Sequence, residues 1–431
     1  MGLTRALAER VSALRFETLP PEAVETVKRG AIDCIGVLFA GMDEPVARIL
    51  LQSIPDGNEA SVLFGDRKAR SADAALVNAA AAHALDYDDT GIDGHPSVVL
   101  VPTMLAEGER LRTSGKAAVA AYVAGYETWG ELVNRDADKH HGKGWHPTAV
   151  FGTVAAAAAA SNLAKLTPEK TMHAIAMAAS MAGGLVANFG SMTKPYQAGR
   201  AAQNGITAAR LAAAGMTASP DALEHQSGFL RAFSPKGNVR TDEKLGDWHI
   251  LRQGLNVKRY PVCYGVHRSI DAVLALDVSA AEVEAAEMRV GRHQGAMLRH
   301  HSPQNALDAK FSGEFAMACA LLRRKVGLAE LKDDFVRSDA VQALMRKVRI
   351  TTTDEADPDE PLFAAYDQVT LTLKNGKVLK SEPVRHARGH ARNPVGLDEL
   401  RAKFDDCTKG ARRALFERLL RLDEQPSLSL D

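Results

Sequence analysis

The chain has 431 residues, 53 basic and 53 acidic side chains, and an apolar content of 46%. A chain of this length usually folds into more than one domain. Its balanced charge gives no reason to expect nucleic acid or an anionic membrane as a partner. The longest weakly apolar run, Ala149 to Ala160, is shorter than the roughly 20 residues of a membrane span, so we expect a soluble protein.

The four cysteines are far apart and have no paired spacing, which argues against a disulfide framework or a cysteine-based zinc site. Such cysteine usage suits a reducing compartment. The N-terminal segment predicts the start of an amphipathic helix rather than a signal peptide. We therefore expect a cytoplasmic protein.

The first 260 residues or so predict helices, because helix-forming residues are abundant and apolar residues recur at helical spacing. Pro20-Pro21 and Thr167-Pro168 provide helix starts. The alanine-rich runs 155–160 and 208–214 carry small side chains, which we expect to allow close packing of helices. The predicted helices are Leu7–Leu14, Val24–Phe39, Ala74–Leu85, Ala117–Val133 and Thr171–Ala187, and a short strand is predicted at Ser61–Phe64.

From about Val266 the pattern becomes mixed. Strands are predicted at 287–290, 348–352, 369–373 and 378–379, and helices at 268–276, 309–323, 397–404 and 411–420. Asn375-Gly376 between two strand patterns predicts a hairpin with a type I′ turn. The predicted fold is mostly α. It has a large all-helical domain, 1–262, with 396–431 packing back on it, and a smaller α+β domain, 263–395.

One acidic segment follows a predicted helix: Asp86, Asp88, Asp89 and Asp93 lie within eight residues. Like charges that are partly buried raise one another's pKa values. This favours a protonated carboxyl that can act as an acid, or a hydrogen-bonded anchor. The alternative interpretation is a solvated loop that caps the helix.

Two histidines precede a proline at a predicted helix start, in His95-Pro96-Ser97 and His146-Pro147-Thr148. Proline suits the first helical position, so each histidine is held just outside its helix. Free amides there favour a carboxylate ligand, and imidazole suits proton transfer near neutral pH. For one histidine alone a capping or core role is the simpler interpretation; the pair favours function.

Two lysines are candidates for binding a carboxylate. Lys194 lies in a predicted loop that leads into a helix near Ala198, where the alternative is a solvated side chain. Lys258 opens a segment with Tyr264 and His267 at the predicted domain junction, a common location for clefts. Cys263 and His267 are four residues apart on a presumed helix and would allow a nucleophilic pair, but a buried cysteine and a packing histidine are the simpler interpretation.

These segments, in this order, resemble the MmgE/PrpD family over nearly the whole chain. The matching stretches are His83–Thr90 with His95-Pro96-Ser97, Trp145–Thr148, Lys194-Pro195, Lys258–Pro261, Asp308–Ser312 and Asn393-Pro394. The resemblance implies a homodimer with a helical domain and an α+β lid domain. It also implies a small polycarboxylate substrate and neither a metal nor an organic cofactor.

The resemblance to the decarboxylase-like members implies that the site consists of Asp86, Thr90, His95, His146, Lys194 and Lys258. We expect Asp86, the threonine and the two histidines of this set to be catalytic, and the two lysines to bind substrate together with Asp89, Tyr264 and His267. The chain differs from those members at Gln197 and Cys263, where they have histidines. The segment from Thr90 to His95 is also shorter.

The chemistry implied by the family is proton transfer at a carbon next to a carboxylate. We expect a lyase of the 2-methylcitrate dehydratase type, with an iminodisuccinate-type epimerase or a cis-aconitate-type decarboxylase as alternatives. Three other classes stay open. They are a serine hydrolase using Ser191-x-x-Lys194, which lacks partner motifs; a metal hydrolase using His140, His141 and His146, which lacks His-Glu-x-x-His; and a non-catalytic carboxylate-binding protein.

Overall fold

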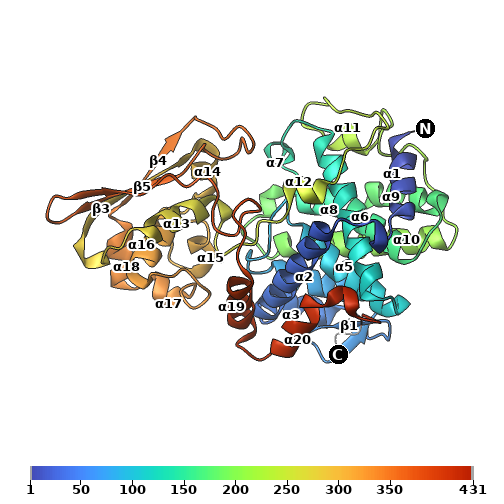
Figure 1. Ribbon diagram of the computed structural model, residues 1–431, viewed down its shortest axis with the longest axis horizontal. Coiled ribbons are helices and arrows are strands. Elements are labelled where there is room, and N and C mark those ends of the chain that lie inside the picture. Colours follow the sequence, from blue (N-terminus) through green and yellow to red (C-terminus); the bar gives the residue numbers. More distant parts are fainter. Residues whose placement is uncertain (1, 429–431) are drawn as a thin grey trace. The chain divides into compact units, whose positions relative to one another are not determined.

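A computed structural model of the chain describes residues 2–428 (Figure 1). It is mostly helical, which confirms the predicted fold class. The chain forms two compact units: one comprises the residues up to Asn256 together with those from Leu397 onward, and the other is Val257–Gly396. The domain boundaries expected from the sequence and the lid role of the smaller domain stay predictions.

The first unit is helical apart from one short hairpin. Its helices are α1 (Leu3–Ala13), α2 (Pro21–Gly41), α3 (Pro45–Ser53), α4 (Ser71–His83), α5 (Pro96–Leu111), α6 (Gly115–Asn134), α7 (His140–Lys143), α8 (Pro147–Leu163), α9 (Pro168–Met181), α10 (Thr193–Ala213), α11 (Phe229–Phe233), α12 (His249–Gln253), α19 (Leu397–Thr408) and α20 (Arg413–Leu420). The hairpin pairs β1 (Ala60–Val62) with β2 (Arg67–Ala69). This hairpin makes the unit slightly less than all-helical.

Helix α8 forms the centre of this unit. All its residues are buried, and it packs against α5, α6, α9 and α10. Its alanines allow close approach: a Cβ atom added at Gly205 of α10 would lie 2.3 Å from Cβ of Ala156. This confirms the expected role of the alanine-rich runs.

The two helix starts predicted from proline are confirmed, but one predicted helix end is wrong. Pro21 and Pro168 begin their helices, and the Thr167 side chain accepts a hydrogen bond from the Lys170 backbone. The prediction that the helix from Thr171 continues to Ala187 is wrong, because α9 ends at Met181. The chain then becomes extended, and the Gly184 carbonyl accepts a hydrogen bond from the His146 backbone N–H (2.9 Å).

The second unit combines a four-stranded sheet with short helices. Its strands are β3 (Val283–Gly291), β4 (Val348–Thr353), β5 (Gln368–Leu373) and β6 (Val378–Lys380), in the order β4-β3-β5-β6. Only β3 and β4 pair in parallel; the other pairs are antiparallel. The helices are α13 (His267–Ala275), α14 (Arg292–Met297), α15 (Ala306–Ala309), α16 (Gly313–Arg323), α17 (Asp333–Val336) and α18 (Asp339–Met345).

Two details of this unit differ from the prediction. The β5–β6 hairpin is confirmed, but the predicted type I′ turn is wrong. Such a turn needs a positive φ at both central residues, and Gly376 has one (82°) whereas Asn375 does not. The predicted helix 309–323 is interrupted after α15. There the Ser312 hydroxyl accepts a hydrogen bond from the Phe315 backbone (3.1 Å) and starts α16 as a new helix.

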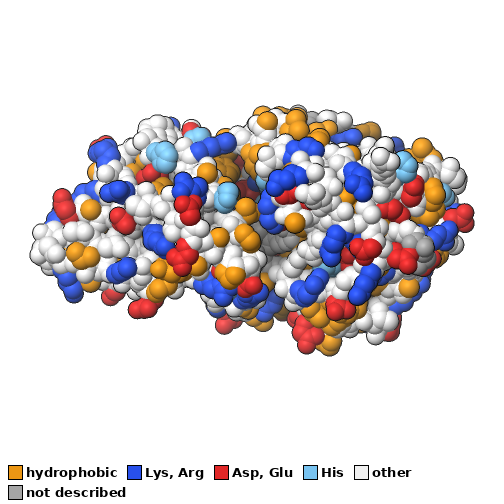
Figure 2. Space-filling view, turned by 90° about the horizontal axis from the view of Figure 1, so that it is seen from above, with side chains coloured by type: hydrophobic (Ala, Val, Ile, Leu, Met, Phe, Trp, Pro, Cys, Tyr) orange, Lys and Arg blue, Asp and Glu red, His pale blue; other side chains and the backbone are white. Residues whose placement is uncertain are grey.

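Across residues 2–428, no helix is both long and apolar enough to cross a membrane. Basic and acidic side chains are interspersed over the face seen in Figure 2, in agreement with a net charge of zero. Near the C-terminal end, α19 and α20 (dark red in Figure 1) pack against α2, which comes from the start of the chain.

Candidate functional site

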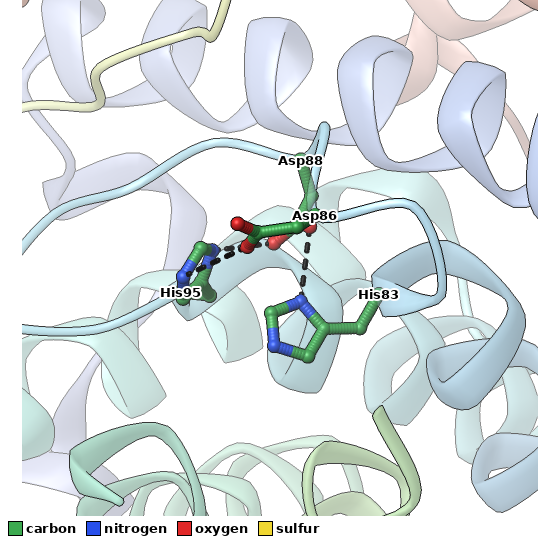
Figure 3. Close-up of side chains that lie close together, drawn as sticks. All are labelled: His83, Asp86, Asp88 and His95. Carbon is green, nitrogen blue, oxygen red and sulfur yellow. Dashed lines mark hydrogen bonds and ion pairs between the residues drawn. The ribbon is translucent and has the colours of Figure 1, made fainter. Parts of the chain in front are cut away.

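The site is built around the loop that joins α4 to α5, residues 84–95. This loop turns sharply, because Asp86, Ile92 and Asp93 adopt positive φ angles of 52°, 42° and 58°. Few non-glycine residues adopt this conformation, and it costs free energy where it occurs. The loop brings His83, Asp86, Asp88 and His95 together, as Figure 3 shows.

The Asp88 carboxylate lies between two histidines. Its Oδ1 is 3.0 Å from Nδ1 of His83, and its Oδ2 is 2.7 Å from Nδ1 of His95 (Figure 3). Burial alone would raise the pKa of Asp88, but the two histidines outweigh it and hold the pKa well below its usual range. Asp88 is therefore a charged acceptor that orients both rings.

His95 directly precedes α5, whose first residue is Pro96, as predicted. Its Nδ1 faces the Asp88 carboxylate and, at 3.0 Å, the Asp89 carbonyl oxygen. Both neighbours are acceptors, so Nδ1 must carry the hydrogen. The remaining nitrogen, Nε2, lies 3.7 Å from Oδ1 of Asp86 and is the atom that can exchange a proton with a ligand.

His146 has the corresponding position before α8, with a different partner. Its Nδ1 lies 2.7 Å from Oε1 of Gln197. The Gln197 amide donates to the Leu185 carbonyl (3.3 Å), which assigns its oxygen to the His146 side. His146 Nδ1 therefore donates, and its buried Nε2 has no hydrogen-bond partner among the described residues.

The electrostatic surroundings keep His146 uncharged. Burial lowers its pKa well below the usual value, and the nearby His83 and Lys194 lower it further, against the opposing effect of Gln197. Burial likewise lowers the pKa of His83 to about 4. At neutral pH the Nε2 lone pair of His146 is thus available as a base.

Lys194 completes the group. It lies in the first turn of α10, not in the predicted loop, and its Nζ is 2.7 Å from Oδ1 of Asp86. The Phe189 ring contacts both Lys194 Nζ (5.1 Å) and the His146 ring (4.8 Å). The His83 ring lies 4.5 Å from His95 and 6.1 Å from His146. We call His83, Asp86, Asp88, His95, His146 and Lys194 the histidine–lysine cluster.

Two other predicted residues lie on the same loop. The Thr90 hydroxyl is buried and has no hydrogen-bond partner within residues 2–428. Asp89 is fully buried, and its carboxyl accepts a hydrogen bond from the Ser97 backbone (3.4 Å). Burial, followed by the charge of Asp33, raises the pKa of Asp89 well above its usual range and so favours the protonated form of this carboxyl.

The remaining predicted residues, Lys258, Tyr264 and His267, belong to the second unit. Lys258 is buried, and the rings of Tyr264 and His267 are 5.0 Å apart. Helix α13 begins at His267, and Cys263 lies before it. The prediction that one helix holds both residues is therefore wrong. Substrate binding by Lys258, Tyr264 and His267 stays a prediction.

Sequence reasoning missed three residues of the site, His83, Asp88 and Gln197. His83 and Asp88 lie in the acidic segment already singled out, but nothing in their spacing distinguishes Asp88 from Asp89. Gln197 was noted only as a difference from decarboxylase-like members. The available signal was its position three residues after Lys194, which on a helix puts both side chains on one face.

The cluster also contains metal-ligand groups. His83, Asp86, Asp88 and His95 each offer a ligand atom, all within 4.8 Å of one another. Both histidines already direct Nδ1 at Asp88, and Asp86 binds Lys194, so a cation would have to displace these bonds. The groups needed by a serine hydrolase are also engaged elsewhere. Lys194 binds Asp86, and Ser191 Oγ donates a hydrogen bond to the Asn188 carbonyl (2.8 Å).

Comparisons with known proteins identify the family of the chain. The MmgE/PrpD N-terminal domain matches residues 5–242, and the MmgE/PrpD C-terminal domain matches residues 260–419. Similar proteins include the cis-aconitate decarboxylases of Mus musculus (29% identical, covering 94% of this chain and 86% of the relative) and Homo sapiens (28%, 94% and 87%). That of Aspergillus terreus is 28% identical, with 94% and 88% covered. Because the N-terminal domain alone spans more than half of the chain, the protein belongs to the MmgE/PrpD family.

Proposed function

We propose that the protein is a lyase that moves a proton at a carbon next to a carboxylate of a small di- or tricarboxylate. One observation carries the proposal: the two histidines before α5 and α8 have different hydrogen-bond partners. His146 presents a neutral Nε2 acceptor, while the Asp88 carboxylate orients His95 so that its Nε2 faces away from this bond. An elimination requires one base and one acid.

In the proposed reaction Lys194 binds a substrate carboxylate next to Asp86. His146 Nε2 takes the proton from the adjacent carbon, and the negative charge that develops is stabilised by the lysine. His95 Nε2 gives a proton to the departing hydroxyl group. The C–H and C–O bonds break, a C=C bond forms and water leaves. We further propose that Thr90 binds the substrate and that Lys258 holds a second carboxylate.

Decarboxylation is the second candidate, because relatives over nearly the full chain are named cis-aconitate decarboxylases. There a C–C bond breaks, carbon dioxide leaves, and His95 delivers a proton to carbon. The contact of Gln197 with His146 favours the first candidate, because the decarboxylase-like members carry a histidine at that position. We propose a homodimer that needs no cofactor in either case.

The test is incubation of the purified protein with 2-methylcitrate, citrate, cis-aconitate and iminodisuccinate, followed by NMR in deuterated water. Dehydration gives an alkene, decarboxylation gives carbon dioxide and a five-carbon dicarboxylate, and epimerisation exchanges deuterium without net product. His95→Gln and His146→Gln should each lower turnover by a factor on the order of 100 or more. Parallel samples with a chelator test for a required metal. Binding of all four compounds without turnover or exchange would contradict the proposal.

A further inference from the structure

A buried lysine outside the histidine–lysine cluster contacts the loop that builds it. Lys403 lies on α19, and its Nζ is 2.5 Å from Oδ1 of Asp33 on α2. The same Nζ donates a hydrogen bond to the Tyr87 carbonyl oxygen (2.8 Å) and lies 4.0 Å from the centre of the Tyr87 ring. The Lys403 side chain is only 8% exposed, so these groups, not water, surround its charge.

Tyr87 is the residue between Asp86 and Asp88. Its carbonyl is part of the peptide bond that leads into Asp88, and the preceding residue, Asp86, has the unusual φ of 52°. The side chains of Asp86 and Asp88 reach Lys194, His83 and His95. A cation bound at the intervening carbonyl therefore holds the backbone from which both carboxylates extend.

The charges beneath the loop also require this lysine. Burial raises the pKa of the Asp33 carboxyl, the ion pair with Lys403 opposes that rise, and the nearby Asp88 adds to it. A buried carboxylate is stable only when it is paired. Lys403 supplies that pairing for Asp33, while the Asp88 carboxylate binds the two histidines.

We propose that Lys403 is a positioning residue: it binds the Tyr87 carbonyl and Asp33 and thereby fixes Asp86 and Asp88 for proton transfer. This inference deepens the proposed function and rests on it. It also means that the loop between α4 and α5 becomes fully ordered only when α19, more than 300 residues later along the chain, has packed against α2.

The test separates positioning from stability with a double variant. Lys403→Met leaves Asp33 unpaired, so both Tm and kcat should fall. Asp33→Asn/Lys403→Met removes the unpaired charge, so Tm should recover while the hydrogen bond from residue 403 to the Tyr87 carbonyl stays absent. We expect kcat of this double variant to stay at least about tenfold low with KM within about threefold, since small misplacements of catalytic groups lower kcat strongly. Lys403→Arg should restore part of kcat.

Arg401 provides the matched control. It is a cation on the same helix, but it pairs with Glu417 on α20 (2.7 Å), so Arg401→Met should leave kcat unchanged. A double variant that regains both Tm and kcat would overturn the proposal, because the ion pair would then only stabilise the fold.

A second readout does not depend on turnover. Histidine Nδ1–H groups bound to a carboxylate give far-downfield proton signals, which can be observed in protein with ¹⁵N-labelled histidine. The resting protein should show such signals for His83 and His95. They should shift or vanish in the double variant and persist in Arg401→Met. If the wild type acts on none of the four compounds, the proposed function fails, and unchanged signals in the double variant would separately refute the positioning role.

Discussion

Nδ1 of His95 lies 2.7 Å from Oδ2 of the buried Asp88, and this bond fixes which nitrogen of the imidazole faces a ligand. Replacing Asp88 with Asn keeps the shape but removes the charge and allows the wrong tautomer. We expect kcat/KM of Asp88→Asn to fall by about 10²- to 10⁴-fold. Steady-state kinetics on the compound that the wild type converts will measure this. Activity within a few-fold of the wild type would show that the bond does not orient the acid.

The neighbouring Asp89 provides the matched control for that experiment. Burial favours the protonated form of its carboxyl in the folded protein, so Asn at this position reproduces the charge and shape of that form. We expect Asp89→Asn to change kcat/KM by less than about threefold, below the usual range for loss of an acid or base. A large loss would mean that Asp89 ionises during the reaction.

The same substitution predicts a pH dependence of stability. The pKa of Asp89 is raised on folding, so above about pH 4 the unfolded chain loses this proton while the folded chain keeps it. The free energy of unfolding of the wild type therefore decreases as the pH rises. Asp89→Asn has no ionisable group at this position and does not show this decrease. The Tm of the variant relative to the wild type should therefore increase from pH 4 towards neutral. A constant difference would contradict the assignment.

Gln197 is the hydrogen-bond partner of His146 and opposes the lowering of the His146 pKa by burial. Replacing it with Glu puts a carboxylate 2.7 Å from Nδ1 and should raise the pKa of His146, which burial holds well below its usual value. If His146 is the base, the acid limb of the kcat/KM profile should move to higher pH in Gln197→Glu. The control Gln197→Leu removes the acceptor and adds no charge, so it should lower activity without that upward movement. Identical limbs in the Glu variant and the wild type would exclude His146 as the base.

His83 makes stability sensitive to acid. Its pKa is lowered from 6.5 to about 4 in the folded protein, mainly by burial. Between these values the unfolded chain binds a proton and the folded chain does not, so stability falls as the pH decreases from 6.5 to about 4, by roughly 3 kcal/mol in full. The Tm of His83→Gln should decline less steeply over this range. The exposed His225→Gln should follow the wild-type curve, and parallel curves for all three would refute the expectation.

How far the sequence predicts this protein depends on how local each feature is. Pro96 and Pro147 determine where their helices begin from neighbouring residues alone, and both His-Pro starts are confirmed. The prediction places the end of α9 too late, because apolar residues continue beyond Met181. The stop signal lies in Gly183-Gly184, where the chain leaves the helix and Gly184 accepts a hydrogen bond from His146.

In the candidate site, too, the features that depend on neighbouring residues are the ones that the sequence predicts. The sequence pointed to Asp86, His95, His146 and Lys194, which the structure brings together. It did not distinguish the roles of neighbouring acids. The positive φ of Asp86 turns successive side chains towards different partners, so Asp88 binds histidines while Asp89 is buried against Ser97. The pairing of Asp86 with Lys194 and the support from Lys403 span 108 and 316 positions of the chain, which no local pattern encodes.

Two aspartates of the loop before α5 each pair with a lysine from another part of the chain. The two pairs differ in burial, and this difference predicts which lysine binds substrate. Lys194 and Asp86 are 10% and 12% exposed, whereas Lys139 and Asp93 are 42% and 26% exposed. A charge-assisted hydrogen bond to a carboxylate in a desolvated site contributes about 1.5 to 3 kcal/mol, so Lys194→Met should raise KM by about 10- to 100-fold. An exposed pair contributes little, so Lys139→Met should leave KM within about twofold. Steady-state kinetics with both variants would decide, and equal effects on KM would show that Lys194 does not bind the carboxylate.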